Sequence, residues 1–188
     1  MKKLLCMLLI FAIMLTGVFA LSSCDDKKDG KDKKDKNDNQ VEVAAPQGYT
    51  TFNNDNIAFA YPSNWTKTEG SITQIINPSG AGNNITVVYE AKTNIYETSS
   101  EDELKAFFTQ TMNAAGMSIS NFKVSKVQNQ NINNIIKITY SASMNSVSMT
   151  QTLFIVNAGS KTYTVTITEV NPDSTLVSNV FNTLTVLK

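Results

Sequence analysis

Residues 161–169 read Lys-Thr-Tyr-Thr-Val-Thr-Ile-Thr-Glu, and this stretch decides the class of fold. Tyr163, Val165 and Ile167 alternate with threonines. Successive side chains of a strand point to opposite faces, so this period of two predicts a β-strand with one apolar face and one hydroxyl face. Threonine suits the outer face of a strand, and we therefore expect the hydroxyl face to lie in solvent.

The same alternation recurs along the chain and indicates a sheet of many strands. Strands with one buried face are expected at residues 57–61, 85–89 and 136–140, and further strands at 72–77, 121–130 and 147–156. Short runs rich in Asn, Gly, Pro and Ser separate them. Such short connections imply antiparallel neighbours.

Two amphipathic helices interrupt the strands. Ser100 and Glu103 form a capping box before an apolar stripe, and Gly116 supplies a helix end. Asn171 followed by Pro172 is typical of the start of a second helix. Together these features predict an α+β domain, a single antiparallel β-sheet flanked by two main helices.

The N-terminus has the features of a lipoprotein signal peptide over residues 1–23. Two lysines precede an 18-residue apolar run, and Leu21, Ser22 and Ser23 lead directly into Cys24. Small residues before a cysteine let a signal peptidase reach the backbone, which predicts a diacylglyceryl group on Cys24 and anchoring in the membrane. Two alternatives stay open: cleavage after Ala20 by an ordinary signal peptidase, and an uncleaved membrane helix.

A charged tether follows, and one domain remains. Residues 25–40 hold six lysines and six aspartates without an apolar side chain, which predicts that residues 24–45 form a disordered tether. The domain at residues 46–188 has eight lysines and nine acidic residues. Its small net charge argues against binding of nucleic acid and of strongly charged ligands.

The residue inventory excludes most common catalytic sites. The chain has no histidine and no cysteine after Cys24, which removes histidine bases, thiolate nucleophiles and the usual zinc sites. The acids at 101–103 fit the first turn of a helix, and residues 53–56 fit a plain turn better than a calcium loop. We expect no catalytic residue, no metal and no cofactor.

Two features could bind a partner. Trp65 is the sole tryptophan and could anchor a partner, although a half-buried corner residue is the favoured interpretation. Thr162, Thr164 and Thr166 could recognise a polymer such as a glycan, with solvent exposure or packing under a helix as the alternatives.

The segment from Phe59 to Trp65, Phe-Ala-Tyr-Pro-Ser-Asn-Trp, resembles PsbP-like domains. The middle amphipathic helix, the long hairpin at 151–164 and the terminal helix extend this resemblance over about residues 48–188. It implies an antiparallel sheet flanked by helices and a non-enzymatic binding or assembly role. Metal ligands proposed for plant members include histidine, which this chain lacks, so no metal site is carried over.

These features predict a non-enzymatic lipoprotein on the extracytoplasmic face of the cell membrane. Its lysine-rich, arginine-free composition favours a low-GC Gram-positive bacterium. Its expected partners are the membrane, through diacylglyceryl-Cys24, and an envelope protein or polymer. The alternatives are a carboxylate-dependent enzyme or enzyme accessory acting on cell-wall polymers, and a ligand-capturing lipoprotein of a transporter.

Overall fold

The computed structural model describes residues 43–80, 82–145 and 147–187. The predicted signal peptide, the predicted lipidation site Cys24 and residues 24–42 of the predicted tether therefore lie outside the described residues. Within that part of the chain, no helix is long and apolar enough to cross a bilayer.

Strands dominate the domain, and among the described residues the strands pair antiparallel throughout. The strands are β1 (Tyr49–Asn53), β2 (Ile57–Pro62), β3 (Thr66–Thr68), β4 (Thr73–Ile76), β5 (Asn84–Ala91), β6 (Ser118–Val127), β7 (Ile135–Met144), β8 (Val147–Ala158), β9 (Lys161–Glu169) and β10 (Thr185–Val186). The helices are α2 (Ile95–Thr98), α3 (Glu101–Ala114) and α4 (Ser174–Thr183).

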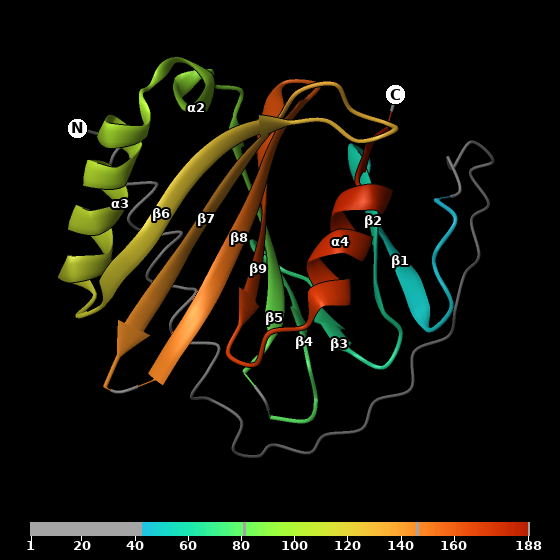
Figure 1. Ribbon diagram of the computed structural model, residues 1–188. Helices are drawn as coiled ribbons and strands as arrows, with labels where there is room; N and C mark the ends of the chain where they lie inside the picture. Colours follow the sequence, from blue (N-terminus) through green and yellow to red (C-terminus); the bar gives the residue numbers. More distant parts are fainter. Residues whose placement is uncertain (1–42, 81, 146, 188) are drawn as a thin grey trace.

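The prediction of a single sheet is wrong, because the strands form two sheets. One has three strands in the order β1-β2-β10, and the other has seven in the order β3-β4-β5-β9-β8-β7-β6 (Figure 1). The break follows Pro62, which has no N–H to continue a ladder. There the N–H of Trp65 donates to the carbonyl of Pro62 at 3.0 Å, and the chain turns out of the first sheet.

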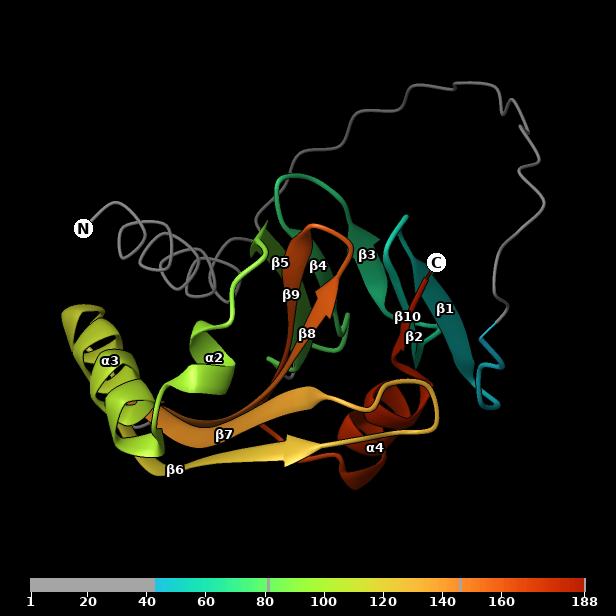
Figure 2. The same cartoon turned by 90° about the horizontal axis from the view of Figure 1, so that it is seen from above.

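Strand β2 is the central strand of the smaller sheet. Its residues Ile57 to Tyr61 are all buried, so both faces of the strand are covered. Helix α4 packs against β2, and Leu176, Val180 and Leu184 join the core between the sheets. Figure 2 shows the small sheet beside the curved large sheet, with α4 at the same end.

The helices differ from the prediction in number and in one boundary. The capping box is confirmed, because Ser100 and Glu103 bond each other's backbone N–H groups, and Gly116 has the expected left-handed φ of 75°. The short helix α2 was not expected. The predicted start at Asn171 is wrong, because the carboxylate of Asp173 accepts the N–H of Thr175 at 2.9 Å and caps α4.

The large sheet carries a core on each face. Helix α3 lies on one face, where Leu104, Phe108 and Met112 cover residues of β7 and β8. Helix α4 and the small sheet lie on the other face, over Phe154, Val165 and Ile167. The two helices therefore divide the sheet into an α3 side and an α4 side (Figure 2).

Candidate binding face

The threonines predicted to lie in solvent are buried. The exposed fractions are 2% for Thr162, 9% for Thr164 and 0% for Thr166. The strand β9 lies between β5 and β8 in the middle of the sheet, and its threonines pair with residues on the α3 side. The prediction of an exposed hydroxyl face on this strand is therefore wrong, because a central strand has both faces packed.

Two of the four threonine hydroxyls of β9, those of Thr162 and Thr168, have partners inside the domain. Thr162 accepts the N–H of Thr93 at 2.9 Å. The hydroxyl of Tyr140 donates to Gln151, and Gln151 Nε2 donates to Thr168 Oγ1 at 3.1 Å. Thr166 differs, since its buried hydroxyl has no hydrogen-bond partner among the described residues.

Trp65 is half-buried and packs against the core between the two sheets. This placement fits the corner interpretation. A role in partner binding stays a prediction.

On the α4 side of the sheet, other strands carry hydroxyl groups that are exposed or half-buried. We define the lysine–hydroxyl strip as a set of six residues on β6, β7 and β8: Lys123, Ser125, Lys137, Thr139, Ser141 and Thr150. Each is exposed or half-buried. They share one face because Lys123 pairs with Thr139, Ser125 with Lys137, and Ser141 with Thr150.

An aromatic pair borders the strip. The ring centroids of Phe154 and of Phe181 on α4 lie 5.3 Å apart. Lys137 Nζ lies 6.0 Å from the centroid of the Phe154 ring. Asn129 Nδ2 donates to the carbonyls of Phe181 and Leu184 at 2.6 and 2.8 Å, which holds the end of α4 against the sheet. The helix therefore forms a fixed wall beside the strip (Figure 1).

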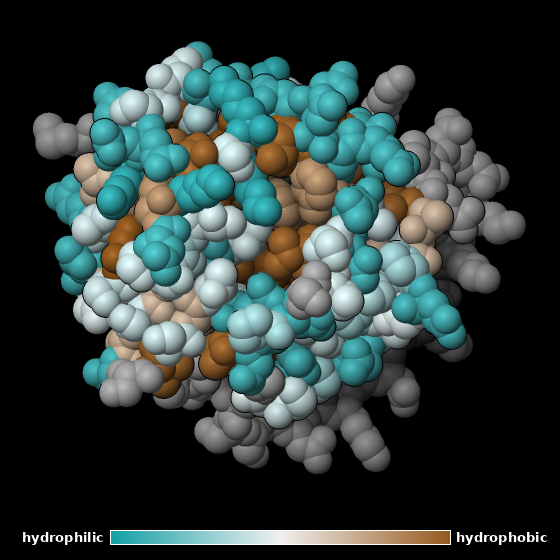
Figure 3. Space-filling view, in the orientation of Figure 1, coloured by the Kyte–Doolittle hydropathy of each residue, from teal (hydrophilic) through white to brown (hydrophobic). Residues whose placement is uncertain are grey.

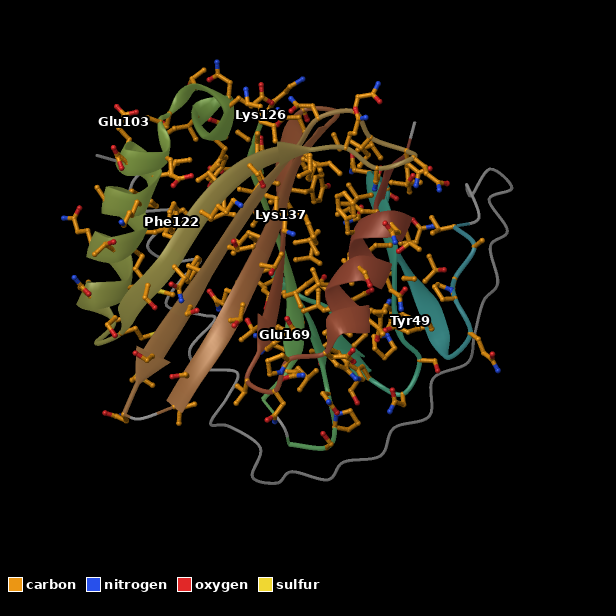
Figure 4. All side chains as sticks on the ribbon, viewed as in Figure 1. Tyr49, Glu103, Phe122, Lys126, Lys137 and Glu169 are labelled. Carbon is orange, nitrogen blue, oxygen red and sulfur yellow. The ribbon has the colours of Figure 1, made fainter. Side chains whose placement is uncertain are left out.

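The space-filling view shows how this face is organised. Hydrophobic residues occupy its middle, and hydrophilic residues surround them (Figure 3). Side chains drawn on the ribbon place Lys137 over the middle of the same face and Glu169 near the start of α4 (Figure 4). The face thus combines apolar surface with hydrogen-bond donors.

A β-bulge shapes the outer edge of the strip. The register of β6 against β7 shifts between Ser120 and Lys123, and Asn121 has a left-handed φ of 54°. Asn121 Nδ2 donates to Ser141 Oγ at 3.4 Å. Bulges of this kind redirect side chains at sheet edges.

The strands that carry the strip contain no acidic residue. Among the described residues, neither Lys123 nor Lys137 forms an ion pair. Lys123 is diagonal to Lys137 across the β6–β7 pair, which places their Cα atoms about 7 Å apart. Helix α4 has no charged residue, so the wall adds no negative charge.

Two carboxyl groups adjoin the strip: that of Glu101, at the edge of β6, and that of Glu169, at the end of β9, where it pairs with Thr150. Glu169 is 6% exposed, and burial raises the pKa of its carboxyl group. Glu169 Oε1 accepts the N–H of Asp173 at 2.7 Å, while the hydrogen bonds from Thr175 lower the pKa of Asp173. The carboxylates of Glu169 and Asp173 thus bind the turn that starts α4.

The acids at 101–103 serve α3. Glu103 caps the helix, and the hydrogen bonds from Ser100 lower its pKa. Glu101 Oε2 accepts the N–H of Val124 at 2.9 Å and so covers one backbone donor of the edge strand β6. In residues 43–80, 82–145 and 147–187, no three His, Cys, Asp or Glu side chains gather as metal ligands.

A shallow hollow lies away from the strip. It runs along the exposed side of α3, holds about 550 Å³ and is lined by Asp102, Lys105, Ala106, Thr109, Gln110 and Asn113. Its one acid and one lysine give it no dominant charge.

Our sequence interpretation missed the strip because its residues come from three strands and have no local motif. One signal was available: residues 118–188 contain five lysines and two acidic residues. The near-neutral net charge of the whole domain concealed this uneven distribution.

The fold and this face define a two-sheet antiparallel β domain with a solvent-facing polar strip. The chain belongs to the PsbP family, whose model matches residues 47–186. The resemblance stated from the sequence is thereby confirmed. Comparison with curated proteins gives no match.

Two solved bacterial structures are similar to this chain. A protein of Bacteroides thetaiotaomicron VPI-5482 has 16% identity and a TM-score of 0.47, over 70% of this chain and 45% of that one. LpqN of Mycobacterium tuberculosis, whose structure is described as involved in cell envelope biogenesis, has 13% identity and a TM-score of 0.41, over 74% of this chain and 91% of its own. This chain therefore spans less than half the length of the Bacteroides protein.

Proposed function

We propose that this protein is a lipid-anchored PsbP-family domain that binds a cell-envelope partner on the lysine–hydroxyl strip and catalyses no reaction. The observation that carries the proposal is the set of polar side chains left without partners on a rigid sheet. Lys123, Ser125, Lys137, Thr139 and Thr150 form no side-chain hydrogen bond with the described part of the chain. Donors that the fold itself does not use are available to a ligand.

The anchor supports an extracytoplasmic setting. A diacylglyceryl group on Cys24 holds the protein at the membrane, because two acyl chains bind far more stably than one. About 20 residues of charged tether give a root-mean-square reach of about 25 Å. The strip can then meet partners near the membrane surface of the envelope.

Carboxylate catalysis is the second candidate, and Glu169 with Asp173 is the pair that favours it. The pKa of Glu169 is raised and that of Asp173 is lowered. Acid–base enzymes use pairs of carboxyl groups whose pKa values differ in this way. Both groups, however, accept backbone N–H groups of the β9–α4 turn. We therefore assign them to the turn and propose binding without chemistry.

Photocrosslinking in intact cells tests the proposed function. A photoreactive amino acid replaces Thr139 in the full-length protein, and a matched control replaces Gln110 on the exposed side of α3. We expect an envelope component to crosslink at position 139 and much less at position 110. Equal crosslinking at both positions, or none at 139, contradicts binding on the strip.

A further inference from the structure

We infer that the strip binds a phosphodiester-linked polymer of the cell envelope. This inference deepens the proposed function and rests on it, since it names the chemistry of the partner at the same site. It differs from the expectation drawn from net charge, which argued against charged ligands.

The first argument is local charge. The Cα atoms of Lys123 and Lys137 lie about 7 Å apart on one face, and β6, β7, β8 and α4 contain no acidic residue. The carboxylate of Glu101 reaches the edge of β6 from α3 and is bonded to a backbone N–H of that strand. Glu169 lies on the same side but at the end of β9, where it is 6% exposed and bonded to the Asp173 N–H. The centre of the strip therefore attracts anions.

The second argument is hydrogen-bond chemistry. A phosphodiester offers only acceptor oxygens, and the strip offers donors: two ammonium groups beside the hydroxyls of Ser125 and Thr139. Hydrogen bonds from lysine to phosphate are charge-assisted and stronger than neutral ones. Each lysine is directly opposite one of these hydroxyls, so both kinds of donor can reach one phosphate.

The third argument is shape, which favours a chain over a membrane surface. A packed helix has a diameter of about 10–12 Å, so α4 stands well above the sheet on which Lys137 lies. A flat bilayer would meet the helix before it met Lys137. A flexible polymer can follow β6 and β7 beside α4 and so reach both lysines.

Competition binding in solution tests the inference with the full-length protein in a non-ionic detergent. The probe is a fluorescent poly(glycerol phosphate) chain. The competitors are unlabelled poly(glycerol phosphate), short-chain phosphatidylglycerol dissolved as monomers at the same phosphate concentration, and neutral dextran. We expect only the unlabelled polymer to displace the probe, and we expect binding to weaken as salt rises from about 50 to about 200 mM.

Variants link the binding to the strip. Replacing both lysines with glutamine (K123Q/K137Q) should weaken probe binding about tenfold, because two charge-assisted contacts are lost. The double arginine variant K123R/K137R keeps the charges and should retain most of the affinity. The matched control K92Q/K105Q removes two exposed lysines elsewhere and should change the affinity less than twofold.

Three results would overturn the inference: displacement by dextran, equal displacement by monomeric phosphatidylglycerol, or equal weakening in K92Q/K105Q. The proposed function can survive such a failure. If position 139 still crosslinks an envelope component in cells while poly(glycerol phosphate) does not bind, the strip has a partner of another chemistry. If neither experiment gives a signal, both proposals are wrong.

Discussion

Lys137 Nζ lies 6.0 Å from the centroid of the Phe154 ring, on the open side of the large sheet. The other neighbour of that ring is Phe181 of α4. A cation at this distance from an aromatic face, at a half-buried site, contributes only about 0.5–1 kcal/mol. Lys137 is therefore a small contributor to folding and a large part of the charge on the strip.

This relationship predicts that Lys137 can be replaced without unfolding the domain. Lys137→Met keeps an unbranched side chain over Phe154 and should lower the free energy of unfolding by less than about 1 kcal/mol. Urea denaturation of the wild-type protein and the variant measures the change. A loss of several kcal/mol would mean that Lys137 is a structural residue and that its binding phenotype has another origin.

Gly82 is expected to resist substitution more than its neighbour Gly80. Both have a left-handed φ, +79° and +72°, but a Cβ at Gly82 would lie 2.7 Å from Val170 Cγ2, whereas one at Gly80 meets nothing within 4 Å. Gly80→Ala should cost about 1–2 kcal/mol for the backbone alone. Gly82→Ala should cost at least about 1 kcal/mol more, because the β9–α4 turn must shift.

The measurement is again the midpoint and slope of urea unfolding, with the two alanine variants compared directly. Asn83 accounts for the sensitivity, since its side chain accepts the N–H groups of Val170 and Asn171 and donates to the Asn171 carbonyl. Equal losses for the two glycines would show that the close contact with Val170 does not constrain the turn.

The two threonines at 166 and 168 should respond in opposite ways to valine. Thr166→Val removes a buried hydroxyl without a partner in the described part of the domain, and should stabilise it by about 1 kcal/mol. Thr168→Val removes the acceptor of Gln151 and should destabilise it by about 1–2 kcal/mol. Thermal unfolding of the pair checks both signs, and a destabilised Thr166→Val would reveal a partner for that hydroxyl.

Glu169 should make stability depend on pH in the direction opposite to acid denaturation. Burial raises its pKa in the folded state, so the carboxyl contributes most when protonated and loses that contribution as pH rises through the folded pKa. Glu169→Gln keeps an oxygen for the Asp173 N–H and cannot ionise. The free energy of unfolding of this variant, relative to wild type, should therefore rise as the pH increases above the ordinary glutamate pKa of about 4.3.

The comparison uses denaturant unfolding of both proteins at several pH values. Taking the difference between them removes the shared effect of Glu103, whose lowered pKa acts in the opposite direction. A difference that is constant with pH would show that Glu169 titrates normally.

Cys24→Ala should release the protein from the membrane if lipidation provides the anchor. Cell fractionation of the wild-type and variant proteins measures the membrane-bound share. An unchanged share in the variant would indicate an uncleaved membrane helix in the apolar run.

Local patterns in the sequence were enough for several elements. The capping box of Ser100 and Glu103, the glycine at 116 and the strands over 57–61, 85–89 and 136–140 depend on neighbours within a few residues, and each is confirmed. The expectation of one buried face is correct for 136–140, but it is wrong for 57–61 and for 85–88, where consecutive residues are all buried. The family resemblance also followed from a short motif, Phe59 to Trp65, and the family match confirms it. The start of α4 was placed wrongly because Asp173, two residues beyond Asn171, makes the cap.

Tertiary structure alone decided three matters. It separated β1, β2 and β10 into a second sheet, since strand partners far apart in the sequence determine which sheet a strand joins. It buried the threonines of β9, because that strand lies in the centre of the sheet. It also brought Lys123, Lys137 and the hydroxyls of three strands together on one open face. A period of two in the sequence tells which side chains share a face, but only the packing of helices and sheets determines which face meets water.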